Sequence, residues 1–232
     1  LPANAQSFWT VDDNGGADFT SLQAAVDAAS AGDVILILDP LVETAVIDKG
    51  LHIQPMGTSL GLLKPEGVNE PALRITGIPA HETVTISSMT VFVGDGGAPA
   101  AVQIDDCDGA VWLQNLFVDS YGAQALLARD AASVVITNSL LQTNLVPALP
   151  DGTPQTGPGA RFEDDSSVYG YFSQFSGSHG SLQGPGNPTP TAAADGGAGV
   201  ILQDSRGAFF SSQIAGSSGN TLFVDGCNQA GS

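Results

Sequence analysis

Short apolar trios recur along this chain, and their alternation constrains its fold more than any other feature. In most trios the first and third residues are apolar and the middle residue varies, as in a strand buried on one face. One set, called here the Val84 column, consists of Leu51-His52-Ile53, Val84-Thr85-Ile86, Val111-Trp112-Leu113, Val134-Val135-Ile136, Val168-Tyr169-Gly170 and Ala208-Phe209-Phe210.

A second set of trios follows the first. This Leu73 column consists of Leu73-Arg74-Ile75, Val102-Gln103-Ile104, Leu126-Leu127-Ala128, Ala160-Arg161-Phe162, Val200-Ile201-Leu202 and Leu222-Phe223-Val224. Two registered columns separated by turns are typical of a solenoid, in which each coil buries its apolar face only against its neighbours. We therefore predict an all-β parallel β-helix that forms a single domain over residues 1–232.

Three segments depart from the coil pattern. Residues 142–159 and 176–199 are rich in Gly, Pro, Ser and Thr, so we predict two loop insertions there. Residues 20–30 predict a short helix, with a capping box that starts at Thr20 and an apolar stripe through Leu22, Ala25 and Val26. Such a helix would cover the open end of the stack and its unpaired strands.

The charge of the chain excludes two classes of partner. Acidic residues number 24 and basic residues 6, for a net charge of −18. Too few cations are present to neutralise a nucleic-acid backbone or to hold an anionic membrane surface. No apolar run approaches the roughly 20 residues of a membrane-spanning helix. We expect an extracellular or cell-surface protein that binds neither nucleic acid nor membrane.

The opening segment carries a resemblance to a known family. Residues 14–29 (NGGADFTSLQAAVDAA) and 32–37 (GDVILI) resemble the start of the pectin-lyase-like superfamily, especially pectin methylesterases and secreted β-helix repeat proteins. The resemblance implies a right-handed parallel β-helix. Pectin methylesterases use two aspartates and an arginine. Residues 124–129 (QALLAR) echo the first of their motifs, but Gln142-Thr143 stands where the second would supply an acid. The carboxylate nucleophile of that esterase chemistry is therefore not matched.

Two sets of acidic residues are the candidates for catalysis or metal binding. Asp164 and Asp165, with His179, could supply general acid and base chemistry to a glycosidic bond. Aspartates also follow the Leu73 column at one place in successive coils, where they would form hydrogen-bonded corners or together hold calcium. These aspartates are Asp106, Asp130, Asp164 and Asp204. No cofactor other than this possible calcium is expected.

Asparagines occupy the corresponding place after the Val84 column. Asn115 and Asn138, with Ser88 and Ser212 as equivalents, predict a ladder of stacked side chains sealed between coils. The two cysteines, Cys107 and Cys227, would lie in one column several coils apart and so remain free thiols.

An aromatic strip is predicted on the outer face of the Val84 column. Alternation directs Trp112, Tyr169 and Phe209 outward, with Tyr171 in the adjacent row. Such a surface on an acidic protein is usually covered, here by the loops, by a sugar chain or by a second copy of the protein.

Three hypotheses of function follow from this surface. The first is a non-catalytic secreted or surface module that contacts polysaccharide or protein through the strip and adjacent loops. The second is a polysaccharide lyase or glycoside hydrolase with its site under the long loops. The third is a structural β-helix that self-assembles into a homo-oligomer. No capping helix follows Val224, so we expect the last coil to be covered by another molecule or by further chain.

Overall fold

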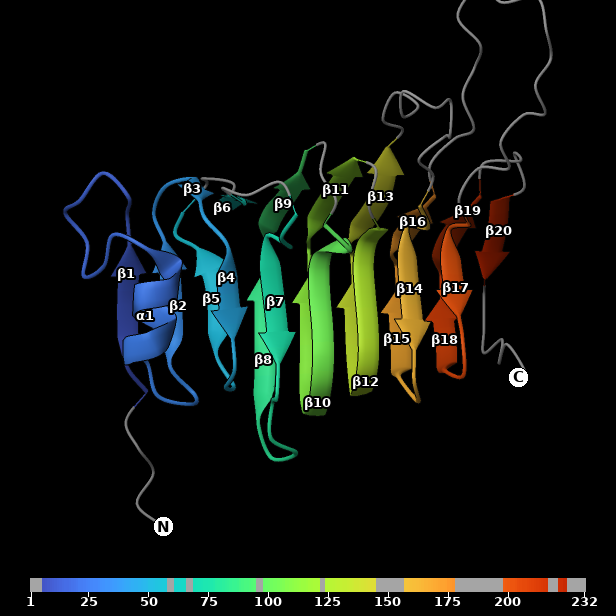
Figure 1. Ribbon diagram of the computed structural model, residues 1–232, viewed down its shortest axis with the longest axis horizontal. Helices are drawn as coiled ribbons and strands as arrows, with labels where there is room; N and C mark the ends of the chain where they lie inside the picture. Colours follow the sequence, from blue (N-terminus) through green and yellow to red (C-terminus); the bar gives the residue numbers. More distant parts are fainter. Residues whose placement is uncertain are drawn as a thin grey trace, which may run out of the picture.

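The computed structural model describes residues 6–57, 61–65, 69–94, 98–121, 124–144, 157–177, 198–216 and 221–224. It is a parallel β-helix with one short helix, α1 (Leu22–Ala28), beside the first strands (Figure 1). The strands form a twelve-stranded and an eight-stranded sheet around one continuous apolar core. None of the described residues forms a helix long and apolar enough to cross a membrane.

The twelve-stranded sheet contains both columns, joined through the long strands β10 (Ala100–Gln114) and β12 (Gln124–Thr137). The Val84 column contains the second halves of β10 and β12. Its other strands are β1 (Phe8–Val11), β2 (Val34–Ile37), β5 (His52–Pro55), β8 (Thr83–Ser87), β15 (Ser167–Tyr171) and β18 (Arg206–Phe210). The Leu73 column contains the first halves of β10 and β12. Its other strands are β4 (Ala45–Ile47), β7 (Leu73–Thr76), β14 (Ala160–Glu163) and β17 (Val200–Leu202).

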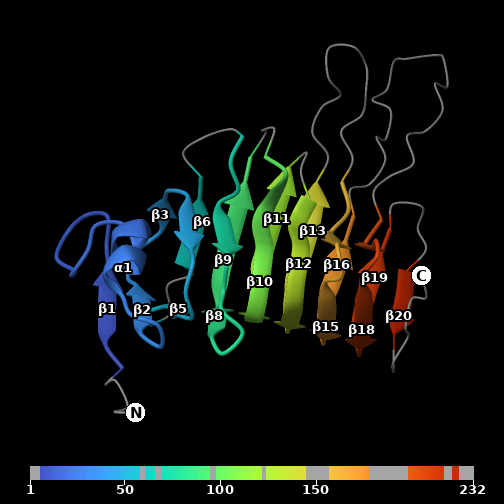
Figure 2. The ribbon, with the colours of Figure 1, turned by 60° about the horizontal axis from the view of Figure 1, so that its bottom comes forward.

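The eight-stranded sheet forms the third face of the coils, seen at the top of Figure 2. Its strands are β3 (Leu41–Val42), β6 (Gly61–Lys64), β9 (Met89–Val93), β11 (Phe117–Tyr121), β13 (Leu140–Asn144), β16 (Gln174–Ser176), β19 (Ser212–Ala215) and β20 (Thr221–Val224). Because β13 continues to Asn144, the first predicted insertion begins later than residue 142. Residues 145–156 and 178–197 lie outside the described residues.

The predicted register holds for the central coils. Val102 pairs with Leu126, and Val111 pairs with Val134, which in turn pairs with Val168. Alternate residues of these strands point into the core, where Val111, Leu113, Val134 and Ile136 are fully buried. Alternation in the sequence therefore identifies the inner face of both columns correctly.

The last trio of the Val84 column was predicted one residue out of register. Val168 pairs with Gly207, and Gly170 pairs with Phe209, so Phe209 points inward and is only 4% exposed. Two glycines make room for its ring: a Cβ atom on Gly170 would lie 2.6 Å from Phe209 Cδ1, and one on Gly207 2.9 Å from Cε2. The prediction of Phe209 as an outward partner-binding residue is therefore wrong: Ala208 takes the outward position beside Tyr169, and Phe210 points outward in the adjacent row.

The last trio of the Leu73 column was also misplaced. Strand β20 runs antiparallel to β19 in the eight-stranded sheet, with Ser212 opposite Val224. Only residues 216–220 connect the two strands, whereas parallel pairing needs a crossover of a dozen or more residues. The register that placed Cys107 and Cys227 in one column is lost with this trio. Cys107 is a buried free thiol whose pKa is raised by burial, and Cys227 lies outside the described residues.

The aspartate corners are confirmed. Asp106, Asp130, Asp164 and Asp204 have φ angles of 52°, 48°, 54° and 49°, in the left-handed region. Aspartate tolerates this conformation because its short carboxylate hydrogen-bonds nearby backbone. Each of these residues turns the chain from the Leu73 column into the Val84 column.

The left-handed conformation of the corner can be tested at Asp204, whose side chain is exposed. Asp204→Ala is expected to lower the free energy of unfolding by about 1 kcal/mol, because the left-handed conformation is sterically unfavourable for alanine, whose side chain forms no compensating hydrogen bond. Asp204→Gly should cost less, since glycine enters this region freely. Urea denaturation of the two variants measures the difference, and equal losses would show that the corner conformation is not the source of the cost.

The corner after the Val84 column differs from the predicted amide ladder. Ser88, Asn115, Asn138, Phe172 and Ser211 occupy it with φ between 47° and 58°. The side chains of Asn115 and Asn138 are exposed rather than sealed between coils. The ladder is built one residue later, by the buried hydroxyls of Ser139, Ser173 and Ser212.

Each hydroxyl of this serine ladder links two coils. Ser139 Oγ donates to Thr137 O at 2.8 Å and accepts from the backbone N–H of Leu116 at 3.0 Å. Ser173 Oγ accepts from Ser139 N and Ser212 Oγ from Ser173 N, at 3.2 and 3.3 Å. A hydroxyl suits this buried place because it can donate and accept at once.

Helix α1 occupies the place of a Leu73-column strand in the first coil and packs against β1, β2 and β4. Its stripe of Leu22, Ala25 and Val26 is buried as predicted. The N-cap is Ser21 rather than Thr20, and Ser21 Oγ accepts from Ala24 N at 3.1 Å. The Glu43 carboxylate accepts from Leu22 N at 2.6 Å, which satisfies another free N–H of the first turn.

Candidate functional site

The two columns present different outer surfaces. The left-handed corner between them reverses the course of the chain, and β14 and β15 lie one over the other in Figure 1 with the core between them. Residues that point outward from the Leu73 column therefore lie on a different face from those of the Val84 column. The long segments 145–156 and 178–197 lead into β14 and β17, both in the Leu73 column.

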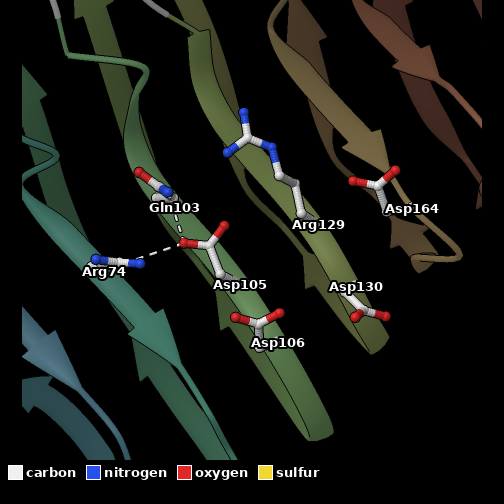
Figure 3. A pocket seen from close by; sticks show the side chains of 7 residues that line it. All are labelled: Arg74, Gln103, Asp105, Asp106, Arg129, Asp130 and Asp164. Carbon is white, nitrogen blue, oxygen red and sulfur yellow. Dashed lines mark hydrogen bonds and ion pairs between the residues drawn. The ribbon is translucent and has the colours of Figure 1, made fainter.

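A charged groove runs across the outer face of the Leu73 column. It has a volume of about 430 Å³ and crosses β7, β10, β12 and the corner after β14 (Figure 3). The groove is lined by Arg74, Gln103, Asp105, Asp106, Arg129, Asp130 and Asp164. Cations are scarce in this chain, with 6 Lys and Arg in total, so two arginines in one groove are a notable local concentration.

Asp105 is the most buried acid in the groove, with a side chain 10% exposed. Its Oδ2 accepts from Gln103 Nε2 at 2.7 Å and from Arg74 Nε at 3.3 Å. The two donors come from its own strand and from the previous coil, as Figure 3 shows. Charge-assisted hydrogen bonds of this kind offset the cost of burying the carboxylate.

A second acid, Glu163, is held beside the groove in the same way. Its Oε2 accepts from Arg129 Nε at 2.9 Å, and its Oε1 lies 2.6 Å from Arg161 Nε. Arg161 also donates from Nη2 to Gln203 Oε1 at 2.8 Å. Among the described residues, Arg74 and Arg129 are held only through Nε, so their terminal nitrogens can donate to a bound molecule.

Three of the aspartates predicted as candidates, Asp106, Asp130 and Asp164, lie in this groove, but its other four residues were not predicted. These four residues occupy the variable middle positions of the Leu73 trios and the next outward position, as Arg74, Gln103 and Asp105 illustrate. The recurrence of Arg, Gln, Asp and Glu on that one row was the available signal.

The predicted catalytic acids Asp164 and Asp165 lie at a corner of the coil. Asp164 and Asp165 are consecutive exposed residues at a corner, both with left-handed φ, and His179 lies outside the described residues. Within the described ranges, no three acidic, histidine or cysteine side chains are grouped so that they could hold a metal ion. The column of Asp106, Asp130, Asp164 and Asp204 therefore has a structural role at the corners and does not form the calcium cluster considered above.

The outer face of the Val84 column carries the aromatic strip. Trp112 and Tyr169 are 39% and 41% exposed, and both pair with Val135 from opposite sides. They therefore lie in one row two coils apart, at about 9.6 Å given roughly 4.8 Å per coil. In the adjacent row Tyr171 stacks on Phe210, with ring centroids 5.0 Å apart and planes within 7°. We define the aromatic strip as Trp112, Tyr169, Tyr171 and Phe210.

Comparisons with known proteins bear on the fold. Neither a protein-family model nor a curated protein matches this sequence. The structure is similar to that of the pectin methylesterase from carrot, with 13% identity and a TM-score of 0.45 over 93% of this chain and 86% of that chain. The likeness is one of fold. A pectin methylesterase in complex with hexasaccharide VII gives a TM-score of 0.47 at 13% identity, over 94% of this chain and 85% of that chain.

Proposed function

We propose that this chain is a secreted or cell-surface module that binds polysaccharide without cleaving it, through the aromatic strip. The observation that carries this proposal is the position of Trp112 and Tyr169, exposed in one row two coils apart. Pyranose rings have apolar C–H faces that pack on aromatic rings. The spacing of the two rings is about the length of a disaccharide, so both can stack on one chain along the axis of the β-helix.

The residues around the two rings support a track for an extended polymer. Val135 lies between the rings, and Thr85 and Ala208 continue the row on either side. These side chains are smaller than the two rings, so the surface is lower between the rings, at Val135, and beyond each of them. The stacked Tyr171 and Phe210 border it on one side. A long shallow track with repeated contacts fits a polymer of repeating units.

The two arginine-held acids in and beside the charged groove do not favour the alternative of a glycoside hydrolase. Hydrolysis of a glycosidic bond requires a carboxylic acid that donates a proton to the leaving oxygen. Asp105 and Glu163 instead accept hydrogen bonds or ion pairs from arginine and glutamine donors. Both carboxylates are therefore held in fixed positions by these donors.

Trp112→Ala combined with Tyr169→Ala is expected to weaken polysaccharide binding about 100-fold, at about tenfold for each stacked ring. Affinity electrophoresis in gels that contain neutral or acidic polysaccharides measures the change, and far-UV circular dichroism should remain that of the wild type. Asp164→Asn combined with Asp165→Asn is the matched control, and we expect it to bind normally.

Three outcomes would contradict the proposal. The first is the appearance of cleaved polysaccharide that is lost in the Asp164 and Asp165 variant, which would establish the enzyme hypothesis. The second is a wild-type oligomer that the double aromatic variant converts to a monomer without any polysaccharide binding. That result, measured by sedimentation, would establish self-assembly as the role of the strip. The third is a wild-type protein that binds none of the polysaccharides tested.

A further inference from the structure

A second groove lies beside the aromatic strip, at the corner where the Val84 column turns into the eight-stranded sheet. It has a volume of about 270 Å³. Its polar lining includes Asn115, Asn138 and Gln174, and its apolar lining includes Phe117, Leu140 and Phe172. We call these six residues the corner groove. Tyr171 directly precedes Phe172 in the chain, so the corner groove continues the surface of the aromatic strip.

Phe172 is an unusual residue at this corner, because it combines a bulky side chain with a left-handed backbone. It has a φ of 51°, whereas the other residues at the same place are Ser88, Asn115, Asn138 and Ser211. A left-handed conformation is costly for a bulky side chain, and strain of this kind is concentrated at functional sites. The ring is 66% exposed, so burial in the core does not repay the cost. Phe117, which is 37% exposed, lines the same groove from β11.

The amides of Asn115 and Asn138 are available to a ligand. Their backbone N–H groups donate to the next coil, to Thr137 O at 2.9 Å and Tyr171 O at 3.0 Å. Both side chains are exposed, and no described residue hydrogen-bonds to either amide. The amides therefore offer donors and acceptors about 4.8 Å apart along the axis. The buried serine ladder fixes the backbone directly beneath them.

Charge decides which kind of sugar fits this surface. None of the described residues that line the corner groove is ionisable, and the chain has a net charge of −18. A polyanion such as a polyuronate would gain no ion pair here and would be repelled by the whole protein. Amide groups beside exposed rings instead match the hydroxyls and apolar faces of a neutral sugar.

We infer that the corner groove is a binding subsite for a neutral sugar unit of the chain held on the aromatic strip. This inference rests on the proposed function, to which it adds the substrate class. Phe172 stacks on the sugar, and Asn115 and Asn138 bind its hydroxyls. Ligand binding then accounts for a bulky residue in this strained conformation, since its exposed ring is not buried in the core.

Isothermal titration calorimetry of the whole chain tests this, with cellohexaose, xylohexaose and mannohexaose as neutral probes and hexagalacturonate as the acidic probe. We expect binding of at least one neutral hexaose and no binding of hexagalacturonate. Phe172→Asn should weaken the neutral hexaose about tenfold, while its melting temperature stays equal to or above that of the wild type, because asparagine suits a left-handed corner. Phe172→Tyr, which keeps a ring, should retain most of the affinity.

The two amides are tested by Asn115→Gly and Asn138→Gly, since glycine keeps the left-handed backbone and removes only the amide. Unchanged affinity in these variants and in Phe172→Asn, with loss on Trp112→Ala, would overturn the corner groove and leave the proposed function standing. Tighter binding of hexagalacturonate than of any neutral hexaose would overturn the neutral class alone. A wild-type protein that binds none of the four probes would overturn the inference and count against the proposed function.

Discussion

Phe209→Ala is expected to lower the free energy of unfolding by about 3 to 5 kcal/mol, the range for removal of a buried phenylalanine ring. The ring fills the space left by Gly170 and Gly207, and it meets Phe175 edge-on with centroids 5.4 Å apart. Gly170, the sheet partner of Phe209, and Gly207, two residues earlier on the same strand, have no side chains that could move into the cavity. The void therefore cannot collapse, which places the cost toward the upper end of the range.

Phe210→Ala is the matched control, because it removes the same ring one residue later from the outer face. Its stacking on Tyr171 is a surface contact, so we expect a loss of about 1 kcal/mol. Chemical denaturation followed by tryptophan fluorescence compares the two variants. A larger loss for Phe210→Ala than for Phe209→Ala would restore the register predicted from the sequence.

Gly109→Ala is the second substitution with a large expected effect, about 3 kcal/mol or more. A Cβ atom at Gly109 would lie 2.6 Å from the carbonyl oxygen of Glu82 and would also overlap Pro79 O. Both are backbone atoms of the previous coil. Gly109 N also donates to Ile78 O at 2.9 Å, so the coils cannot separate without breaking a hydrogen bond.

Gly94→Ala serves as the control for this prediction. A Cβ atom at Gly94 would meet only Phe92 Cε1, at an ordinary contact distance of 3.7 Å. We expect it to change stability by less than about 1 kcal/mol. Thermal melts of both variants should show a drop confined to Gly109→Ala, and similar melting temperatures would mean that the coils adjust freely at this corner.

The alternation of apolar residues determined the solenoid and most of its core. Val111, Leu113, Val134 and Ile136 were predicted inward and are fully buried, because period-2 patterning can satisfy a half-buried strand only in one orientation. The aspartate corners followed from the same alignment, since aspartate is among the few residues that accept a left-handed φ. The outward directions of Trp112 and Tyr169 came from alternation too.

Tertiary structure decided what local pattern leaves ambiguous. Ala208-Phe209-Phe210 is apolar at all three positions, so only the space left by Gly170 in the neighbouring strand and Gly207 in its own strand selected Phe209 for the core. Strand β20 resembles its predicted column in sequence, yet the short connection from β19 allowed only a hairpin. The charged groove and the corner groove depend on contacts between residues 20 or more positions apart, such as Arg74 with Asp105. Those contacts form only when the coils stack along the axis of the β-helix, so the sequence of a single coil does not predict them.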